Sequence, residues 1–229
     1  MVVLGIETSS KLGSVALWRD GHPLCERLLE QSLRHGALLF VELRRVHQEA
    51  GLEPSQVDLI AVSLGPGSFT GLRIGIASAR TAAYVLEKPL LGVPSLDAIA
   101  ANAPPEAEHV AVVLDARRGE VYACLYARAG EGLEPRMPYQ VVRPEALELP
   151  APCVVLGDAA ERCAAVLVRP GVTLGDKEAW RPRASVVARL AAARFERGER
   201  QDIHALAPLY LRRPEAEDVW ERKQGGGGK

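Results

Sequence analysis

The sequence is poor in cysteine and in long apolar runs, and each shortage argues against a class of protein. Four cysteines occur in 229 residues, far apart and without a Cys-x-x-Cys pair, which argues against a disulfide-stapled domain and predicts reduced thiols. No uncharged run approaches the roughly 20 residues that span a bilayer. The first residues contain neither a basic region nor a small-residue cleavage site. We therefore expect a cytoplasmic protein without membrane contact.

The sequence also lacks an excess of either charge. Its 28 Lys and Arg residues are balanced by 29 Asp and Glu residues, for a net charge of −1. A domain whose main task is nucleic-acid binding usually has a basic excess. We therefore expect any role with nucleic acid to be indirect. The length allows a substantial core, in one large or two small domains.

What the chain does contain is a repeated order of elements. Apolar alternation and turn residues predict three strands (2–6, 13–18 and 24–29), followed by helix 34–50, strand 57–64, helix 68–87, strand 90–93 and helix 95–101. After a Pro-Pro break the order restarts with two strands joined by a tight turn within 109–132. Strand 153–156, helix 158–168, strand 172–174 and helix 184–197 follow.

The two rounds of this order share a detail at their start. Aligning GIETSSKLGSVALW with VLDARRGEVYACLY places Glu7 opposite Asp115, each at the end of a first strand and before a hairpin. Two such units predict an α/β fold, a duplicated ribonuclease-H-like (ASKHA-type) architecture as in actin, Hsp70 and hexokinase. We expect an N-terminal lobe of residues 1–104, a C-terminal lobe of residues 105–205 and a cleft between them. The terminal segment 206–229 is expected to start ordered, able to pack back on the first lobe, and to end frayed.

The stretch GPGSFTG resembles a phosphate loop only superficially. A Walker loop needs Lys and a hydroxyl after its last glycine, whereas Leu-Arg follows Gly71. A dinucleotide-binding fingerprint is also excluded, because the second gap between the glycines is one residue too long. We interpret Gly65 and Gly67 as turn residues and Ser68 as the cap of the following helix, whose free amino end could still hold an anion.

That helix has an unusual distribution of side chains. Its only charges, Arg73 and Arg80, lie seven residues apart on one face, together with aromatic and aliphatic residues. A face this apolar indicates cover by another subunit, or else by the preceding helix of the same chain. We hypothesise a partner interface formed by both helices. Its candidate residues are Leu38, Leu39, Phe69, Arg73, Ile76 and Arg80.

The search for catalytic groups finds no strong motif. The sequence has no His-Glu-x-x-His, no Gly-x-Ser-x-Gly and no Cys-His pairing, so we expect no catalytic residue, no metal site and no cofactor. Glu7, Ser9 and Asp115 are weak candidates for cofactor binding, because carboxylates facing a cleft can hold magnesium or act as a base. The alternative is that each carboxylate caps its own hairpin.

Five stretches together resemble a known family: LGIETSSKLGSVAL, VSLGPGSFTGLRIGIASARTAA, GVPSLDAIA, VLDARRGEVYACLY and PLYLRR. They are similar to the TsaB (YeaZ) family of bacterial tRNA threonylcarbamoyladenosine biosynthesis, over nearly the whole chain. Glu7 departs from the aspartate of many members but keeps the charge.

The resemblance implies a non-catalytic scaffold or activator. Its implied partners are the catalytic paralogue TsaD, the ATPase TsaE and, for the isolated chain, a second copy, with tRNA contacted only through the complex. The paralogue carries a His-x-x-x-His metal pair where this chain has Ser95 and Ile99, and neither residue can replace an imidazole. The resemblance also implies that the first two helices form the contact. The alternative is a small-molecule kinase or ATPase of the same superfamily, with Glu7 and Asp115 at the phosphates.

Overall fold

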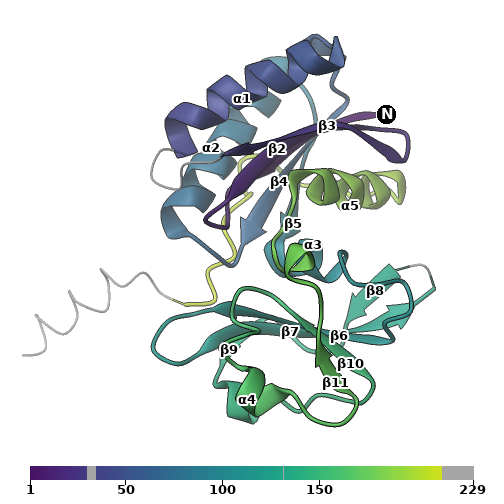
Figure 1. Cartoon of the computed structure of the whole chain (residues 1–229). Helices are drawn as coiled ribbons and strands as arrows, with labels where there is room; N and C mark the ends of the chain where they lie inside the picture. Colours follow the sequence, from purple (N-terminus) through teal and green to yellow (C-terminus); the bar gives the residue numbers. More distant parts are fainter. Residues whose placement is uncertain (30–34, 131, 213–229) are drawn as a thin grey trace, which may run out of the picture.

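The computed structural model describes residues 1–29, 35–130 and 132–212, and they form two lobes, each built on its own β-sheet (Figure 1). Within these ranges, no helix combines the length and the apolarity needed to cross a membrane.

The first lobe contains a five-stranded sheet in the order β3-β2-β1-β4-β5. The first three strands pair antiparallel as two successive hairpins, and β4 and β5 continue the sheet in parallel with β1. The strands are β1 (Val2–Glu7), β2 (Gly13–Arg19), β3 (His22–Leu29), β4 (Leu59–Gly65) and β5 (Leu90–Pro94).

Helices cover both faces of this sheet. Figure 1 shows α1 (His35–Ala50) and α2 (Phe69–Leu86) on one face and α5 (Ala184–Glu196) on the other. Alternation along β1 explains the two layers, because Leu4 belongs to the core shared with α1 and α2 whereas Val3 belongs to the core shared with α5. A short 3-10 turn (Pro54–Gln56) connects α1 to β4.

The position of α5 corrects the predicted lobe boundaries. Helix 184–197 was expected in the lobe of residues 105–205, but α5 packs on the first sheet through its small apolar residues Val187, Ala188 and Ala191. The physical reason is that helical periodicity identifies a buried face but not the sheet that buries it. The division near Pro104 stays a prediction for the rest of the chain.

The second lobe repeats the topology of the first. Its sheet has the order β11-β10-β6-β7-β8, and β9 pairs with the other part of β7. Read from β8, the order counted from β6 is third-second-first-fifth-sixth, and it matches the first sheet when β8 and β9, which both pair with β7, are counted as one position. The predicted α/β two-sheet ASKHA-type fold is therefore confirmed. The strands are β6 (His109–Asp115), β7 (Val121–Ala129), β8 (Gly132–Pro135), β9 (Gln140–Val142), β10 (Cys153–Leu156) and β11 (Val172–Leu174).

Two details of the second lobe differ from the sequence prediction. Helix 158–168 shortens to one turn, α4 (Ala164–Leu167), because the Asp158 carboxylate accepts the Asp115 N–H and the Ala159 N–H donates to the Val113 carbonyl. These bonds hold the chain in turns. Strands β8 and β9 were not predicted, since neither has an alternating apolar pattern. Two further 3-10 turns are Pro144–Ala146 and Lys177–Trp180.

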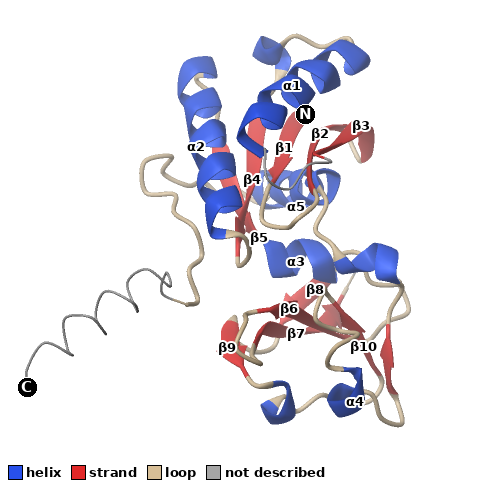
Figure 2. Ribbon diagram, turned by 60° about the vertical axis from the view of Figure 1, so that its left-hand side comes forward, coloured by secondary structure: helices blue, strands red, loops and turns tan. Residues whose placement is uncertain are grey.

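Helix α3 (Ser95–Ala100) lies between the lobes, as Figure 2 shows. The Asp97 carboxylate accepts a hydrogen bond from Tyr126 at 2.8 Å and one from Tyr139 at 2.7 Å, and it pairs with Arg194 at 2.6 Å. These partners come from β7, the loop between β8 and β9, and α5. Burial, reinforced by the nearby Asp97 charge, raises the pKa of both tyrosines. One carboxylate therefore ties the second sheet to two helices of the first lobe.

We expect Asp97→Ala to destabilise the chain by about 3–5 kcal/mol, because it leaves a half-buried guanidinium and two hydroxyls without their acceptor. Urea denaturation at neutral pH measures this loss. The matched control is Glu161→Ala, which removes an exposed carboxylate paired with Lys177 and should leave stability nearly unchanged. Equal losses in the two variants would contradict the proposed tie.

Candidate functional site

The start of α2 lies directly on the loop between β1 and β2. A Cβ at Gly67, Gly71 or Gly75 would collide with the carbonyl of Ser9 or Thr8 or with the Thr8 hydroxyl. The Ser68 N–H donates to the Ser9 carbonyl at 2.7 Å. The glycines therefore allow backbone contact between helix and loop, which is the role of glycine where two chains approach closely.

Ser68 is the N-cap of α2, as predicted, and its hydroxyl accepts the Gly71 N–H at 3.2 Å. The structure thus agrees with the interpretation of GPGSFTG as a turn followed by a capped helix. Gly65 has a φ of +91°, which other residues rarely adopt.

Two of the predicted interface residues lie in the core. Leu39 is fully buried and Ile76 is 4% exposed, and both pack against the first sheet. They cannot contact a partner in this structure, which corrects the prediction. The reason is that α2 is apolar nearly all round, so no polar residue marks where its buried arc ends. Leu38 is half-buried beside the same core.

The exposed apolar residues of the two helices are different ones. Phe40 is 64% exposed and Val41 44% exposed on α1, and Tyr84 and Val85 are each 70% exposed on α2. None of these four residues is among the six candidate interface residues named from the sequence. Their signal in the sequence was weak, because apolar residues that the core buries wholly or in part, such as Leu39, Ala83 and Leu86, stand beside them.

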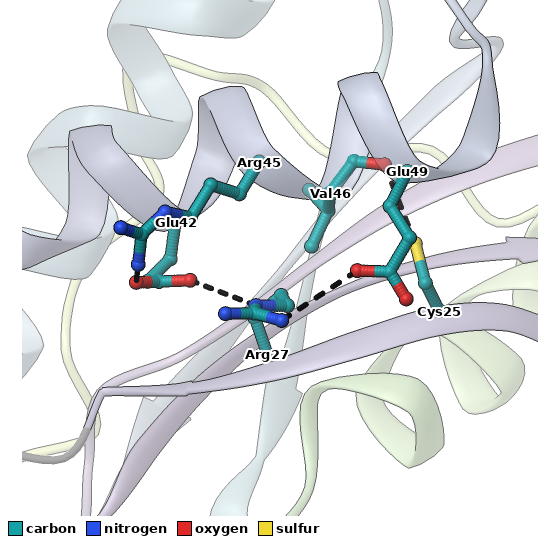
Figure 3. Close-up of polar contacts among 6 residues, drawn as sticks. All are labelled: Cys25, Arg27, Glu42, Arg45, Val46 and Glu49. Carbon is teal, nitrogen blue, oxygen red and sulfur yellow. Dashed lines mark hydrogen bonds and ion pairs between the residues drawn. The ribbon is translucent and has the colours of Figure 1, made fainter.

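Polar contacts fix the rotation of α1 and so the side on which Phe40 and Val41 emerge. Glu42 points toward the sheet with 6% exposure, and Figure 3 shows its carboxylate between Arg27 of β3 at 3.0 Å and Arg45 at 2.6 Å. A buried carboxylate is costly unless it is paired. The Cys25 thiol also donates to the Val46 carbonyl at 3.3 Å.

The segment 203–212, called here the C-terminal strap, covers part of the outer face of α2. The Tyr210 ring stacks on Phe69 with centroids 5.2 Å apart, and the Tyr210 hydroxyl accepts a hydrogen bond from Arg73 at 3.2 Å. Arg80 donates to the His204 carbonyl at 3.3 Å. Three predicted interface residues, Phe69, Arg73 and Arg80, are therefore already in contact with the chain's own terminal segment.

The strap joins the two lobes. Its Leu206 is buried in the core of the first lobe, and its Leu209 N–H donates to the Leu64 carbonyl at 2.8 Å. Its Arg212 binds the Ala116 carbonyl and the Glu120 carboxylate at the β6–β7 turn. Residues 206–212 therefore pack back on the first lobe and reach the second, whereas the rest of the predicted segment, 213–229, lies outside the described residues.

Glu7 does not face the cleft, which corrects a second prediction. Its side chain is fully buried, and one carboxylate oxygen accepts hydrogen bonds from the N–H and the hydroxyl of Ser9. Its other oxygen has no partner, although the Ser63 hydroxyl lies beside the carboxyl without a well-formed hydrogen bond. Burial raises the pKa of Glu7.

Asp115 does line the cleft between the lobes, and so does Ser9. Burial acts to raise the pKa of Asp115, but the Arg117 N–H at 2.9 Å and the Arg162 guanidinium at 3.0 Å together outweigh it and lower the pKa. The hydrogen bond from the Arg117 N–H is the one expected if Asp115 caps its own hairpin, which was the alternative to cofactor binding. The cleft therefore receives one of the two predicted carboxylates. Within the described ranges, no three His, Cys, Asp or Glu side chains are grouped to hold a metal ion.

The positions that match the paralogue's histidine pair have structural roles here. The Ser95 hydroxyl is buried and donates to the Pro66 carbonyl at 2.6 Å. Ile99 is buried in the core between α3 and the second sheet. Ser95 thus holds α3 under the turn that precedes α2, and Ile99 packs α3 on the second sheet.

Comparisons with known proteins agree with this geometry. Residues 30–172 match the family described as "TsaD: tRNA N6-adenosine threonylcarbamoyltransferase". The chain is 32% identical to the tRNA threonylcarbamoyladenosine biosynthesis protein TsaB of Bacillus subtilis, over 98% of this chain and 100% of that protein. This chain belongs to the TsaB family. The TsaB protein of Escherichia coli is 30% identical over 98% of this chain and 99% of its own length.

A solved TsaB-family structure extends the agreement to three dimensions. The structure of YeaZ from Pseudomonas aeruginosa superposes with a TM-score of 0.83 at 31% identity, covering 92% of this chain and 99% of that one. The resemblance inferred from the five sequence stretches is thus confirmed. The match to the transferase family over residues 30–172 includes both helices that carry the exposed apolar side chains.

Gly71→Ala should destabilise this TsaB-family chain. Alanine favours a helix by about 0.5–1 kcal/mol, but the collision of its Cβ with the Thr8 backbone should cost about 1–3 kcal/mol and displace the start of α2. Thermal denaturation followed by circular dichroism measures the balance. Gly132→Ala is the control, because a Cβ there would meet only the Ala129 carbonyl, at an ordinary contact distance of 3.8 Å. An unchanged melting temperature for Gly71→Ala would refute the close contact.

Glu7→Gln should change how stability depends on pH. Because the folded pKa is raised above the unfolded value near 4.5, the contribution of Glu7 is complete below that value and is lost as the pH rises through the folded pKa. Glutamine does not titrate. The variant should therefore gain stability relative to wild type as the pH rises above the unfolded value, measured by urea denaturation. Glu106→Gln, at an exposed position, is the matched control, and a constant difference for Glu7→Gln would contradict the assignment.

Proposed function

We propose that this chain is a non-catalytic scaffold or activator in tRNA threonylcarbamoyladenosine biosynthesis, where it binds the catalytic paralogue TsaD and the ATPase TsaE. The observation that carries the proposal is the exposure of Phe40, Val41, Tyr84 and Val85 on two neighbouring helices. Large apolar side chains exposed on adjacent helices are typical of surfaces that bind another protein. Membership of the TsaB family supports the pathway.

The proposed interface is a revision of the one inferred from the sequence. Leu38 is retained at the edge of the proposed interface. Leu39 and Ile76 are excluded from it because they are buried in the core. Phe69, Arg73 and Arg80 form a part that the strap covers, and Tyr84 and Val85 form a part that is open. Tyrosine exposed beside aliphatic residues is a frequent anchor of protein interfaces.

The same helices are proposed to contact either the paralogue or a second copy of the chain. Because one surface cannot do both at once, the dimer and the complex with the paralogue would exclude each other. Contact with tRNA is proposed to be indirect, since the net charge of −1 gives no general attraction to phosphates.

The kinase or ATPase alternative has less support. A kinase of this fold would need Glu7 at the phosphates, but the side chain is fully buried under the start of α2. Asp115 is held by Arg162 and by the turn of its own hairpin. Neither carboxylate is free to act on a substrate as placed.

The test replaces Tyr84 and Val85 together by lysine, which suits the C-terminal end of α2 because cations are favourable there. Both side chains are 70% exposed, so folding should be retained. We expect affinity for purified TsaD to fall at least about tenfold, measured by calorimetry and gel filtration.

The control for this test is Val166→Lys, which charges a comparable exposed aliphatic residue, 42% exposed, on α4 of the second lobe. It should bind TsaD as wild type does. Unchanged binding by the double variant, with its circular dichroism spectrum intact, would rule out this end of α2 as the contact.

A further inference from the structure

A groove lies between α2 and the C-terminal strap, on the outward side of the helix. Its volume is about 370 Å³, and its lining residues are Ala77, Arg80, Thr81 and Tyr84 of α2 and Ile203 and His204 of the strap. Ala77 and Thr81 have small side chains, which leave room between the helix surface and the strap. The groove is continuous with the exposed apolar end of α2, because Tyr84 belongs to both.

The groove contains a cation whose charge is not neutralised. The Arg80 guanidinium donates to the His204 carbonyl at 3.3 Å, and it forms no ion pair with any described residue. Asp202, the residue before the strap, accepts the His204 N–H at 2.8 Å instead of pairing with Arg80. A guanidinium has five N–H donors in a fork that matches a carboxylate, so most of the donors of Arg80 are open to a ligand.

The helices around the groove offer no acid of their own to this cation. The two charges within α2 are both arginines. The two acids of α1, Glu42 and Glu49, both pair with Arg27 of β3. A surface that is apolar and cationic complements a partner surface that is apolar and acidic.

A second copy of the chain complements this groove poorly. In a two-fold dimer the same patch faces itself, so the arginines of one α2 would meet those of the other if the two helices paired along their length. Like charges placed in this way oppose association. The acid nearest in sequence is Glu87, the C-cap of α2, about 10 Å beyond Arg80 along the helix axis. A dimer that brought Glu87 to Arg80 would pair only the last turns of the two helices.

We propose that the groove receives a carboxylate side chain, Asp or Glu, which a partner protein presents next to a large apolar residue. The carboxylate binds the fork of Arg80, and the apolar residue packs on Tyr84 and Val85. This inference rests on the proposed function, because it takes TsaD as the partner that supplies the carboxylate. It adds the reason why the surface selects such a partner over a second copy: Arg80 determines the specificity.

Salt dependence separates the two occupants, because screening weakens an Arg–carboxylate pair but strengthens an association that like charges oppose. The full-length chain is titrated with purified TsaD by calorimetry, and its self-association is measured by sedimentation equilibrium, each at about 50 mM and about 500 mM NaCl. We expect the affinity for TsaD to fall about threefold to tenfold between the two concentrations. Self-association should stay the same or strengthen.

Variants at Arg80 isolate the effect of its charge. Arg80→Gln should weaken TsaD binding at low salt at least about fivefold and flatten the salt dependence, and Arg80→Glu should weaken binding further. Arg80→Lys should retain part of the affinity and of the salt dependence. The salt dependence decides the role of Arg80, because a contact that only held the strap in place would be lost equally at both salt concentrations.

The matched control is Arg189→Gln. Arg189 is exposed on α5, on the other face of the first sheet, and its guanidinium likewise donates to a backbone carbonyl, that of Ala101, at 3.2 Å. This variant should bind TsaD as wild type does, at both salt concentrations.

Ala77→Leu tests the groove itself. Leucine is a good helix former and fills the space beside Arg80 without changing the charge, so TsaD binding should fall at least about fivefold while the melting temperature is retained. Unchanged binding by this variant would show that the groove is not the site of contact.

Four further outcomes would overturn the proposal. Three concern TsaD: binding to wild type that does not weaken with salt, binding by Arg80→Glu equal to that of wild type, or an equal loss in Arg189→Gln. The fourth is a self-association that weakens with salt and is reduced by Glu87→Gln, which would assign the groove to a second copy. In all of these cases wild type still binds TsaD and the proposed function stands, whereas a wild type that does not bind TsaD would overturn both.

Discussion

The close contact between the start of α2 and the β1–β2 loop is the constraint on which the rest of the structure depends. Gly67, Gly71 and Gly75 leave no room for side chains between the helix and the loop, so α2 must lie with its small face on the loop. With that face held, Ile76 turns into the core, and Tyr84 and Val85 turn outward. The surface that we propose for a partner is therefore set by residues on the opposite side of the helix.

The same contact changes the chemistry of the hairpin beneath it. The Ser9 carbonyl is used by the Ser68 N–H, and the Ser9 hydroxyl is used by Glu7. Glu7 is sealed from solvent, and burial raises its pKa. A loop that is occupied in this way has little left to offer a substrate.

Polar contacts beneath the surface determine which side chains of the helices are exposed. Glu42, held by Arg27 and Arg45, fixes α1 on the sheet (Figure 3), and the strap fixes α2 through Tyr210 and Arg212. Asp97 ties the lobes together from the inside. The contacts of the strap and of Asp97 join elements far apart in the sequence, so the outer face of α2 and the width of the cleft depend on the whole fold.

Most of the fold could be predicted from local patterns in the sequence. Alternating strands, the Gly-Pro-Gly turn and the Ser68 cap could be read from neighbouring residues, because backbone conformation and amphipathic period are properties of short segments. The site could not be read in the same way. Leu39 and Phe40 are adjacent and both apolar, yet one is core and one is surface. The burial of Glu7, the packing of α5 on the first sheet and the strap across α2 depend on contacts between distant segments, and periodicity contains no information on which distant surface a segment will meet.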